Sequence, residues 1–360
     1  MDGFKNIKIN NFRGIDHLEI DDFSRVNVFL GQNNSGKSSV LEAIFLIAGM
    51  YNPDLPQIIN AFRTRKAYSN FSDIKYLFRN LNLKNLPEIT SEQFDNIARH
   101  LAIRLSYEYN GHTQITSPSI NAVYSDAIAD VNLLEMDFDV TKGEITQHHQ
   151  SRLVANQRGE LIHSEMDPLY QDPFGCSITS ADLTIGNVTT ELSELFKRKM
   201  KNVILQRLTL FDRRVNAIEI LANDIFIGFN GIDELIPIGM AGDGLRRYLS
   251  IIANSANPAN NIILIDEIDN GLHYSAYKKL WEALFALAVS TNKQIFVTTH
   301  SKETLQKLNQ MLAEHPEYQN EMRLYTIENT LKKGFQAYKY TYEGLSGACE
   351  NDVELRSIIQ

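Results

Sequence analysis

Three short apolar runs of this chain are each followed by a segment with helical spacing of its apolar residues. Such runs are typical of strands buried on both faces of a sheet. The predicted strands are Val26–Leu30, Ile262–Ile265 and Gln294–Thr298, and the predicted helices that follow them are Ser38–Gly49, Tyr274–Val289 and Lys302–Ala313. Strands that alternate with helices at this spacing predict an α/β fold with a mostly parallel core sheet, covered by helices on both faces.

Other strands are predicted on either side of this core. Phe4–Asn10 alternates between polar and apolar residues, and His17–Ile20 is spaced to pair with it as an N-terminal antiparallel portion. The remaining candidates are the strands Ile225–Phe229, Glu234–Ile238, Arg323–Glu328 and Phe335–Tyr342, and the helix Leu245–Ser255.

The middle of the chain has a different character. Residues 51–182 are rich in Asn, Ser, Asp and Tyr, with strand-like runs at Leu101–Tyr109 and Val131–Val140. Helical periodicity resumes over Thr190–Leu221 without sustained heptads, which argues against a long coiled-coil arm within the chain. We therefore predict a core domain of residues 1–50 and 225–360, with an inserted helical or mixed lobe of residues 51–224.

Composition narrows the class of protein. The 360 residues include 43% hydrophobic and 22% charged residues, as in ordinary globular proteins. The longest apolar stretches are strand-sized, so no membrane span is expected. Only Cys176 and Cys349 are present, far apart, which favours a reducing cytoplasm. The net charge of −9 argues against a protein that coats DNA, although a local basic groove would escape this test.

The clearest motif lies directly after the first buried strand. Residues Gly31 to Ser38 read GQNNSGKS and match G-x-x-x-x-G-K-[ST] at every fixed position. In this pattern glycines let the backbone N–H groups surround a phosphate, and the following helix points its positive end at the same anion. Lys37 is expected to reach the β- and γ-phosphates, and the Ser38 hydroxyl to bind Mg²⁺. The predicted ATP-binding residues of the loop are Gly31, Asn33, Asn34, Ser35, Gly36, Lys37, Ser38 and Ser39.

Two further strands end in polar residues that suit the same chemistry. Ile262–Ile265 runs into Asp266 and Glu267, and we expect Asp266 to arrive beside Mg²⁺. Glu267 is the candidate catalytic base that orients or deprotonates the attacking water. The third strand runs into His300, a second catalytic candidate, because open α/β sheets bind ligands at the carboxyl ends of their strands.

A glycine-rich segment, Gly239–Arg247, precedes Asp266 by about twenty residues and opens a helix. Because one P-loop already supplies the local phosphate site, we predict that Gly242, Asp243 and Gly244 bind ATP held by a neighbouring copy.

The order of these motifs resembles the ABC ATPase head shared by SMC, RecF and OLD proteins. Four segments are more specifically similar to OLD-like AAA-type ATPases: Phe12–Gly14, Met240–Arg247, Asp266–His273 and Thr298–Ser301. The resemblance implies that Arg13 lies near the nucleotide, that Gly242–Gly244 cap the γ-phosphate of the partner's ATP, and that Asn270–His273 cross a dimer interface. The chain departs from the pattern where Ala241 or Met240 replaces the usual signature serine, and His273 stands where many relatives carry Asp. The glutamine that senses Mg²⁺ in this class has no identified counterpart.

Several other residues favour ordinary explanations. OLD nucleases carry a metal-dependent domain after the ATPase, and about 60 residues follow His300, so we expect no nuclease domain here. Asp137 and Asp139 on an alternating strand indicate an acidic solvent face. His148, His149 and His163 lack regular ligand spacing and are expected in solvated loops. Aromatic residues between 51 and 110 are either core residues or platforms for stacking bases.

Two functional hypotheses remain from the sequence. In the first, the chain is the sensor ATPase of a bacterial anti-phage defence module, dimerises around ATP and Mg²⁺, and controls a separately encoded effector. In the second, it is a RecF-like ATPase that loads onto DNA. The acidic charge and the missing coiled coil favour the first.

Overall fold

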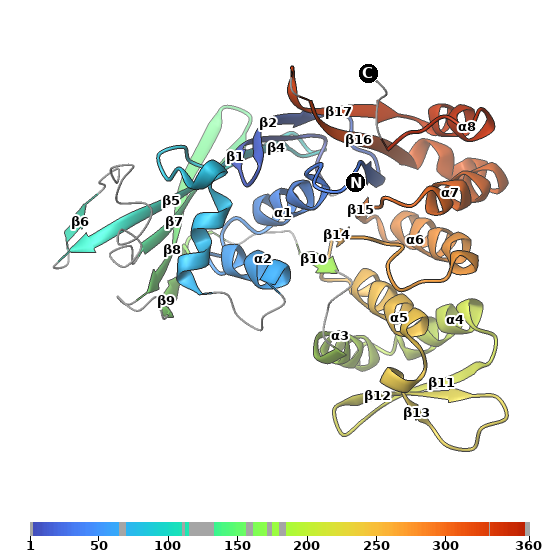
Figure 1. Cartoon of the computed structure of the whole chain (residues 1–360). Coiled ribbons are helices and arrows are strands. Elements are labelled where there is room, and N and C mark those ends of the chain that lie inside the picture. The colour runs from blue at the N-terminus through green and yellow to red at the C-terminus, as the bar shows by residue number, and fades with distance from the viewer. Residues whose placement is uncertain are drawn as a thin grey trace.

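The computed structural model describes residues 3–64, 70–109, 112–114, 133–155, 161–170, 175–179, 185–330 and 332–356. Two large sheets share the chain, with one helix between them and a set of helices on the outer face of one sheet (Figure 1).

The central sheet has six strands in the order β10-β14-β15-β3-β16-β17. All neighbours are parallel except the terminal hairpin of β16 and β17. Its strands are β10 (Cys176–Thr179), β14 (Ile262–Ile265), β15 (Gln294–Thr298), β3 (Val26–Leu30), β16 (Met322–Thr330) and β17 (Gly334–Tyr340). The parallel core sheet predicted from the three apolar runs is confirmed by the pairing of β14, β15 and β3, which are buried over their whole length.

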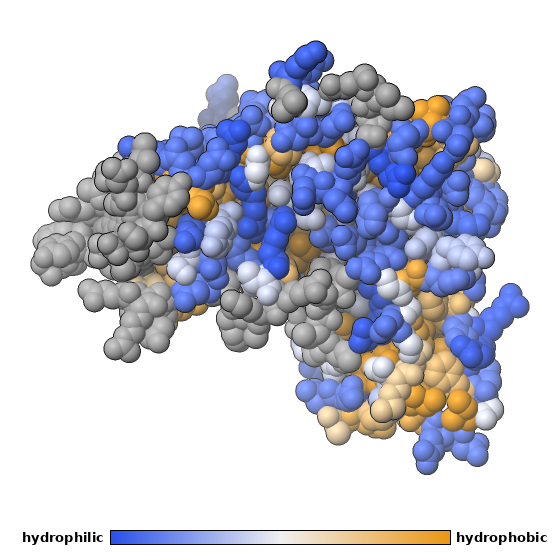
Figure 2. All heavy atoms as spheres, in the orientation of Figure 1, coloured by the Kyte–Doolittle hydropathy of each residue, from blue (hydrophilic) through white to orange (hydrophobic). Residues whose placement is uncertain are grey.

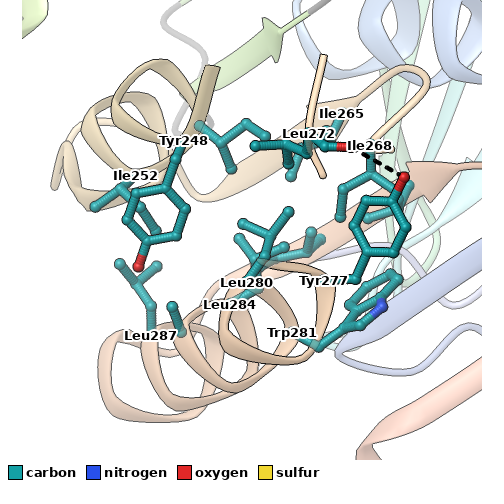
Figure 3. Packing of buried hydrophobic residues seen from close by; sticks show 14 of the residues in the cluster. Tyr248, Ile252, Ile265, Ile268, Leu272, Tyr277, Leu280, Trp281, Leu284 and Leu287 are labelled. Atoms are coloured by element: carbon teal, nitrogen blue, oxygen red, sulfur yellow. Dashed lines mark hydrogen bonds between the residues drawn. The ribbon is translucent and has the colours of Figure 1, made fainter. Parts of the chain in front are cut away.

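Alternate residues of these strands feed two different cores. Val26 and Val28 face a cluster that includes residues of α5 (Asp243–Ala256), α6 (Tyr277–Thr291) and α7 (Lys302–Glu314), whereas Phe29 faces α1 (Lys37–Ala48). Figure 3 shows part of the first cluster, where Leu280, Trp281 and Leu284 of α6 pack between the other labelled side chains. Successive side chains of a strand point to opposite faces of the sheet. Because both faces of these strands are buried, each face packs against its own layer of helices.

The second sheet is antiparallel and runs in the order β2-β1-β4-β5-β7-β8-β9, with β6 paired to β5. Its strands are β1 (Ile7–Phe12), β2 (Ile15–Ile20), β4 (Glu88–Glu92), β5 (Ile97–Tyr109), β6 (His112–Gln114), β7 (Leu133–Lys142), β8 (Ile145–Ala155) and β9 (Leu161–Glu165). The predicted pairing of the first two strands is confirmed, with Ile9 opposite Leu18. Between β1 and β4 in the chain lie α1, α2 (Leu55–Thr64) and the short 3₁₀ helices η1 (Phe71–Leu77) and η2 (Arg79–Leu81).

The helical interpretation of Thr190–Leu221 is correct only in its first part. Helices α3 (Ile185–Lys197) and α4 (Lys201–Phe211) lie there, but Val215–Leu221 is strand β11. This strand pairs with β12 (Asp224–Phe229), which pairs with β13 (Ile236–Pro237) in a small third sheet. The buried residues Val215 and Ile218 are three positions apart, as in a helix, because the strand register shifts between Val215 and Ala217; pairing with β12 shows that the segment is a strand. Figure 2 shows apolar surface over this end of the molecule.

Strand pairing also crosses the predicted boundary of the inserted lobe. The lobe was expected to be helical or mixed, but β4 pairs with β1 and β10 pairs with β14, so strands of residues 51–224 extend both sheets. The division into a core of 1–50 and 225–360 and a lobe of 51–224 stays a prediction. Residues 131 and 132 of one predicted strand lie outside the described residues, and the structure begins that strand at Leu133.

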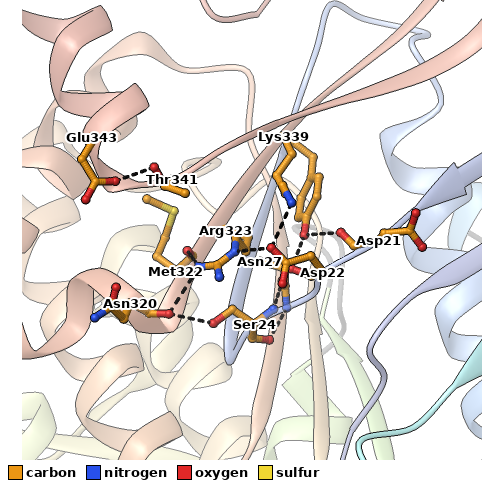
Figure 4. A network of polar contacts seen from close by, with 11 residues as sticks. Asp21, Asp22, Ser24, Asn27, Asn320, Met322, Arg323, Lys339, Thr341 and Glu343 are labelled. Atoms are coloured by element: carbon orange, nitrogen blue, oxygen red, sulfur yellow. Dashed lines mark hydrogen bonds and ion pairs between the residues drawn. The ribbon is translucent and has the colours of Figure 1, made fainter.

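A polar network ties the turn before β3 to the terminal hairpin (Figure 4). Arg323 and Lys339 both donate to Asp22 Oδ2 at 3.0 Å, and the Tyr325 hydroxyl donates to the carbonyls of Asp21 and Asp22. Partial burial alone would raise the pKa of Asp22. The positive charges and hydrogen bonds of Arg323 on β16 and Lys339 on β17 outweigh this effect and lower the pKa. The network fixes the start of β3, the strand that leads into the P-loop. The chain then closes with α8 (Tyr342–Glu350).

Candidate functional site

The GQNNSGKS loop connects β3 to α1 through backbone conformations that favour glycine. Gly31 and Gly36 have φ of 149° and 97°, and a Cβ at Gly31 would lie 2.4 Å from the carbonyl oxygen of Ile327. Asn34 also has a positive φ, of 64°, which asparagine tolerates better than most residues. These requirements explain why the loop needs glycine at positions 31 and 36.

Two polar groups of this loop fit an anionic ligand. The Lys37 ammonium donates to the carbonyls of Gly31 and Gln32 at 2.8 Å, which holds it over the loop. The Ser35 hydroxyl is buried without a hydrogen-bond partner among the described residues, as expected of a donor meant for a ligand. The first turn of α1 contains no acidic residue, so no carboxylate competes for its N-terminus.

Lys37 lies opposite a group of carboxylates. Burial lowers the pKa of Lys37, and the nearby charges of Asp266, Glu267 and Asp269 act in the opposite direction. The Lys37 ammonium thus lies between these carboxylates and the phosphate-binding loop. In that position it is suited to neutralise the negative charge of a triphosphate.

The carboxylate of Asp266 binds two hydroxyl groups from neighbouring elements. Ser38 Oγ on α1 donates to Asp266 Oδ1 at 3.1 Å, and Thr298 Oγ1 at the end of β15 donates to the same atom at 2.5 Å. Oxygen ligands of this kind suit Mg²⁺, so Ser38 and Asp266 fit the metal that the sequence assigned to them. This convergence follows from the sheet, because β14, β15 and β3 are parallel neighbours and end at one edge.

Glu267 is held in a backbone conformation that is unusual for glutamate. Its φ is 49°, its N–H donates to Thr298 Oγ1 at 2.8 Å, and its carboxylate accepts from Asn270 Nδ2 at 3.3 Å. A non-glycine residue in this region costs about 1–3 kcal/mol and persists where surrounding contacts enforce it. The side chain is exposed at the sheet edge, where an attacking water can reach it.

The glycine-rich segment is linked to these carboxylates within the same chain. Helix α5 begins after Gly242, whose φ is 98°, and its Arg247 donates to the carbonyls of Asp266 and Glu267 at 2.8 and 3.3 Å. The Asp243 carboxylate pairs with Arg246 at 2.8 Å. The side-chain position of Gly244 faces the Gly271 carbonyl, so the start of α5 and the loop of Asn270–His273 form one exposed surface.

Arg13 contacts α1 rather than the loop itself. Its Nε donates to Glu42 Oε2 at 2.7 Å, and the other oxygen of Glu42 accepts from Arg63 at 2.6 Å. Arg63 also donates to Ser39 at 3.2 Å, one residue after Ser38, the predicted ligand of Mg²⁺. Burial lowers the pKa of Arg13, against the attraction of Glu42. A nucleotide role for Arg13 stays a prediction, with this network as its route to the P-loop.

His300 follows β15 at the same sheet edge and is exposed. Its carbonyl accepts from Arg356 at 3.1 Å. The structure therefore brings together the predicted residues of the P-loop, Asp266, Glu267 and His300, and it places Gly242–Gly244 on an exposed helix start.

Sequence reasoning missed several contacts of this site. Arg63 carries no motif that signals its contact with Ser39. Thr298 was quoted in a motif without a role, and its position at the end of a buried strand was the available signal. Arg247 was likewise part of the glycine-rich motif, but only its contact with the Asp266 carbonyl reveals what it holds.

The features expected to be ordinary are explained by local pairing. Asp139 contacts His148 and His100 on neighbouring strands, and Asp137 accepts from Gln150. His149 is not a solvated loop residue: it lies on β8, pairs with Asp167 at 2.8 Å and stacks on Phe138. Within the described ranges no group of three or more His, Cys, Asp or Glu is arranged to hold a metal ion. No helix among them is long and apolar enough to cross a bilayer.

Comparison with known proteins shows what the chain is similar to. The family model described as "AAA ATPase domain" matches residues 4–173 and 177–305. An "ATP/GTP phosphatase" of Helicobacter pylori is 24% identical over 353 residues, covering 90% of this chain and 92% of the relative. The "DNA replication and repair protein RecF" of Francisella tularensis is 25% identical over 237 residues, 62% of this chain and 63% of the relative. An SMC head domain from Pyrococcus furiosus, solved with the C-terminal domain of ScpA, covers 98% of this chain and 100% of that chain, with 10% identity and a TM-score of 0.49.

The class defined by the loop, the sheet and the family model is therefore a P-loop ATPase. The chain belongs to the AAA ATPase domain family, and it hydrolyses ATP.

Proposed function

We propose that this ATPase is a dimeric switch in which each ATP is bound by the P-loop of one copy and capped by Gly242–Gly244 of another. The observation that carries the proposal is the exposed start of α5 beside the exposed loop of Asn270–His273. A helix start that offers free N–H groups binds anions, and here it is presented outward. Neither its own Asp243, paired with Arg246, nor another described side chain occupies it as a cap.

The residues of one copy have separable tasks in this scheme. Lys37 and the loop N–H groups bind the β- and γ-phosphates, and Ser38 and Asp266 hold Mg²⁺. When bound, Mg²⁺ neutralises charge that develops on the phosphate oxygens. Glu267, oriented by Asn270 and by its strained backbone, accepts the proton of the attacking water. His300, exposed at the same sheet edge, is assigned to donate to a γ-phosphate oxygen.

Arg247 connects the two halves of the switch. It lies three residues after Gly244 on α5 and holds the backbone of Asp266 and Glu267. Movement of the helix start toward a partner's ATP therefore displaces the carbonyls beside the chain's own catalytic carboxylates. We infer that closure on one ATP adjusts the neighbouring active site.

The biological setting we propose is the sensor ATPase of a bacterial anti-phage defence module, acting in the cytoplasm on a separately encoded effector. The net charge of −9 supports this role over DNA loading. The resemblance to RecF proteins makes DNA loading the alternative. Measurement of duplex DNA binding between low and high salt decides between them, because a DNA-loading protein binds with a steep salt dependence. Copurification from the native operon identifies the effector.

The dimer is tested with Glu267→Gln, which keeps the side-chain shape and removes its basicity. ATP should trap the variant as a closed dimer, measured by light scattering coupled to gel filtration. The same mass and compactness with and without ATP would contradict the shared site.

A further inference from the structure

A separate hollow of about 510 Å³ lies between α4, α5, α6 and the 3₁₀ helix η6 (Pro316–Glu321). None of the residues assigned to the ATP site lines it. The lining comprises Arg207, Thr209, Leu210, Arg213, Tyr248, Lys279, Glu282, Ala283, Ala286, His315 and Tyr318. Small-molecule sites typically measure about 300–1,000 Å³ and combine apolar walls with a few polar groups, as this hollow does.

The rim of the hollow carries unusual positive charge for an acidic protein. Arg207 and Arg213 form no ion pair or side-chain hydrogen bond with any described residue. Most arginines of the described ranges do pair with a carboxylate: Arg13, Arg25, Arg63, Arg79, Arg104, Arg152, Arg214, Arg246, Arg323 and Arg356. Lys279 adds a third cation and donates to the Phe211 carbonyl at 3.1 Å. Two free guanidinium groups beside a lysine suit a phosphate or carboxylate ligand.

Aromatic rings form the walls. Tyr248 stacks on Phe211 at 4.3 Å, and Tyr318 stacks on His315 at 5.6 Å. The residue Tyr248 is 1% exposed as a whole and lines the hollow, and its hydroxyl makes no hydrogen bond to another described residue. Figure 3 shows this hydroxyl at the edge of the core cluster, whereas the Tyr277 hydroxyl points to the Leu272 carbonyl. A hydroxyl at the wall of a hollow, with no bond to the protein, is free to bond a ligand there.

We propose that this hollow is a regulatory site for a small phosphorylated nucleoside. Arg207, Arg213 and Lys279 bind its phosphate, the rings of Tyr318 and His315 lie along its base, and Tyr248 donates to a polar atom of the ligand. Glu282, whose carboxylate lies 3.7 Å from the Lys278 ammonium, is the single acid of the lining and an acceptor for ribose hydroxyls.

Helix α5 joins this site to the ATPase site. Tyr248 faces the hollow, and the preceding residue, Arg247, holds the carbonyls of Asp266 and Glu267. A ligand that shifts α5 therefore alters the geometry of the catalytic carboxylates. Helix α5 would then link ligand binding in the hollow to catalysis at the ATPase site.

Binding is measured first, by calorimetry on Lys37→Ala, because this variant removes the P-loop as a competing site. The probes are the 5′-monophosphates and cyclic monophosphates of adenosine, guanosine, cytidine and uridine, with inorganic phosphate as the arm without a base. We expect saturable binding of at least one nucleotide at or below about 1 mM. Inorganic phosphate should bind at least tenfold more weakly, because it lacks a group that contacts the rings.

The variant Arg207→Glu/Arg213→Glu should lose this binding, and Arg198→Glu should keep it. Arg198 is a matched control because it is exposed and outside the hollow. If the double variant is poorly folded, Tyr248→Phe removes only the hydroxyl and should weaken binding about 3- to 10-fold. No binding of any probe, binding equal in the charge-reversal variant, or preference for an acidic aromatic peptide over every nucleotide would each overturn the proposal.

Regulation is measured next, on chains with an intact P-loop, and this step rests on the ATPase activity. The nucleotide that binds should change the rate of ATP hydrolysis at least twofold in the wild type and in Arg198→Glu, and leave the rate of the double variant unchanged. A saturated site with an unchanged rate refutes a regulatory role. Failure of ATP hydrolysis itself would be visible without any nucleotide probe, so the two failures are distinguishable.

Discussion

Thr298→Val tests whether one hydroxyl aligns the two carboxylates proposed for the ATPase site, the metal ligand Asp266 and the base Glu267. Thr298 is fully buried, donates to Asp266 Oδ1 at 2.5 Å and accepts from the Glu267 N–H at 2.8 Å. Valine has the same shape and makes neither bond. A hydrogen bond to a charged group contributes about 1.5–3 kcal/mol, and a buried N–H left without a partner costs about 1–3 kcal/mol.

The two effects are not strictly additive, because Asp266 keeps its bond from Ser38 and Glu267 is partly open to water. We therefore expect the free energy of unfolding to fall by about 2–4 kcal/mol. Without the bond to its N–H, Glu267 also loses a contact that maintains its φ of 49°, so kcat should fall at least tenfold.

Urea denaturation gives the free energy of unfolding, and phosphate release at saturating ATP and Mg²⁺ gives kcat. Thr298→Ser is the matched control, since it retains the hydroxyl and should keep most of both quantities. A Thr298→Val protein with wild-type kcat and a stability loss below about 0.5 kcal/mol would refute this account of the site.

Three further predictions concern other parts of the molecule. Lys37→Ala should abolish ATP binding in a calorimetric titration while the melting temperature stays near that of the wild type, and unchanged affinity would contradict the P-loop assignment. Gly242→Glu should leave ATP binding nearly intact but prevent the ATP-dependent dimer of a Glu267→Gln chain, because bulk and negative charge are placed at the exposed helix start. Burial lowers the pKa of Lys293 to about 8, so the unfolded chain binds more protons above that pH and wild-type stability should rise between pH 8 and 10 relative to Lys293→Met. Parallel stability curves for these two proteins over that range would show that Lys293 does not titrate as described.

The ATP site was largely readable from the sequence because its chemistry is carried by local patterns. The loop of Gly31–Ser38 needs glycines at fixed positions to turn tightly, and the strand before Asp266 is apolar because both of its faces are buried. Parallel strands end at one edge of a sheet, so three strand ends predicted separately were expected to meet. The structure confirms that meeting through the contacts of Ser38 and Thr298 with Asp266.

The antiparallel sheet and the small third sheet were harder to predict. Strands β5, β7 and β8 bury one face and expose the other only in parts, so their alternation is weak. Val215–Leu221 was taken for helix because it continues an apolar segment, and only its pairing with β12 makes it a strand. Whether Val215–Leu221 forms a strand therefore depends on its pairing with β12 and not on its own spacing of apolar residues.

The sequence by itself determined the phosphate loop, the acidic strand end and the parallel direction of the strands around them, because each depends on residues within a few positions of one another. Only the tertiary structure decided which side chains hold these groups in place. Arg63 reaches Ser39, Arg247 reaches the Asp266 carbonyl, and Tyr248 opens into a cationic hollow, each through contacts between helices or strands that are far apart in the chain. Such contacts follow from packing of whole elements, which no local spacing of residues encodes.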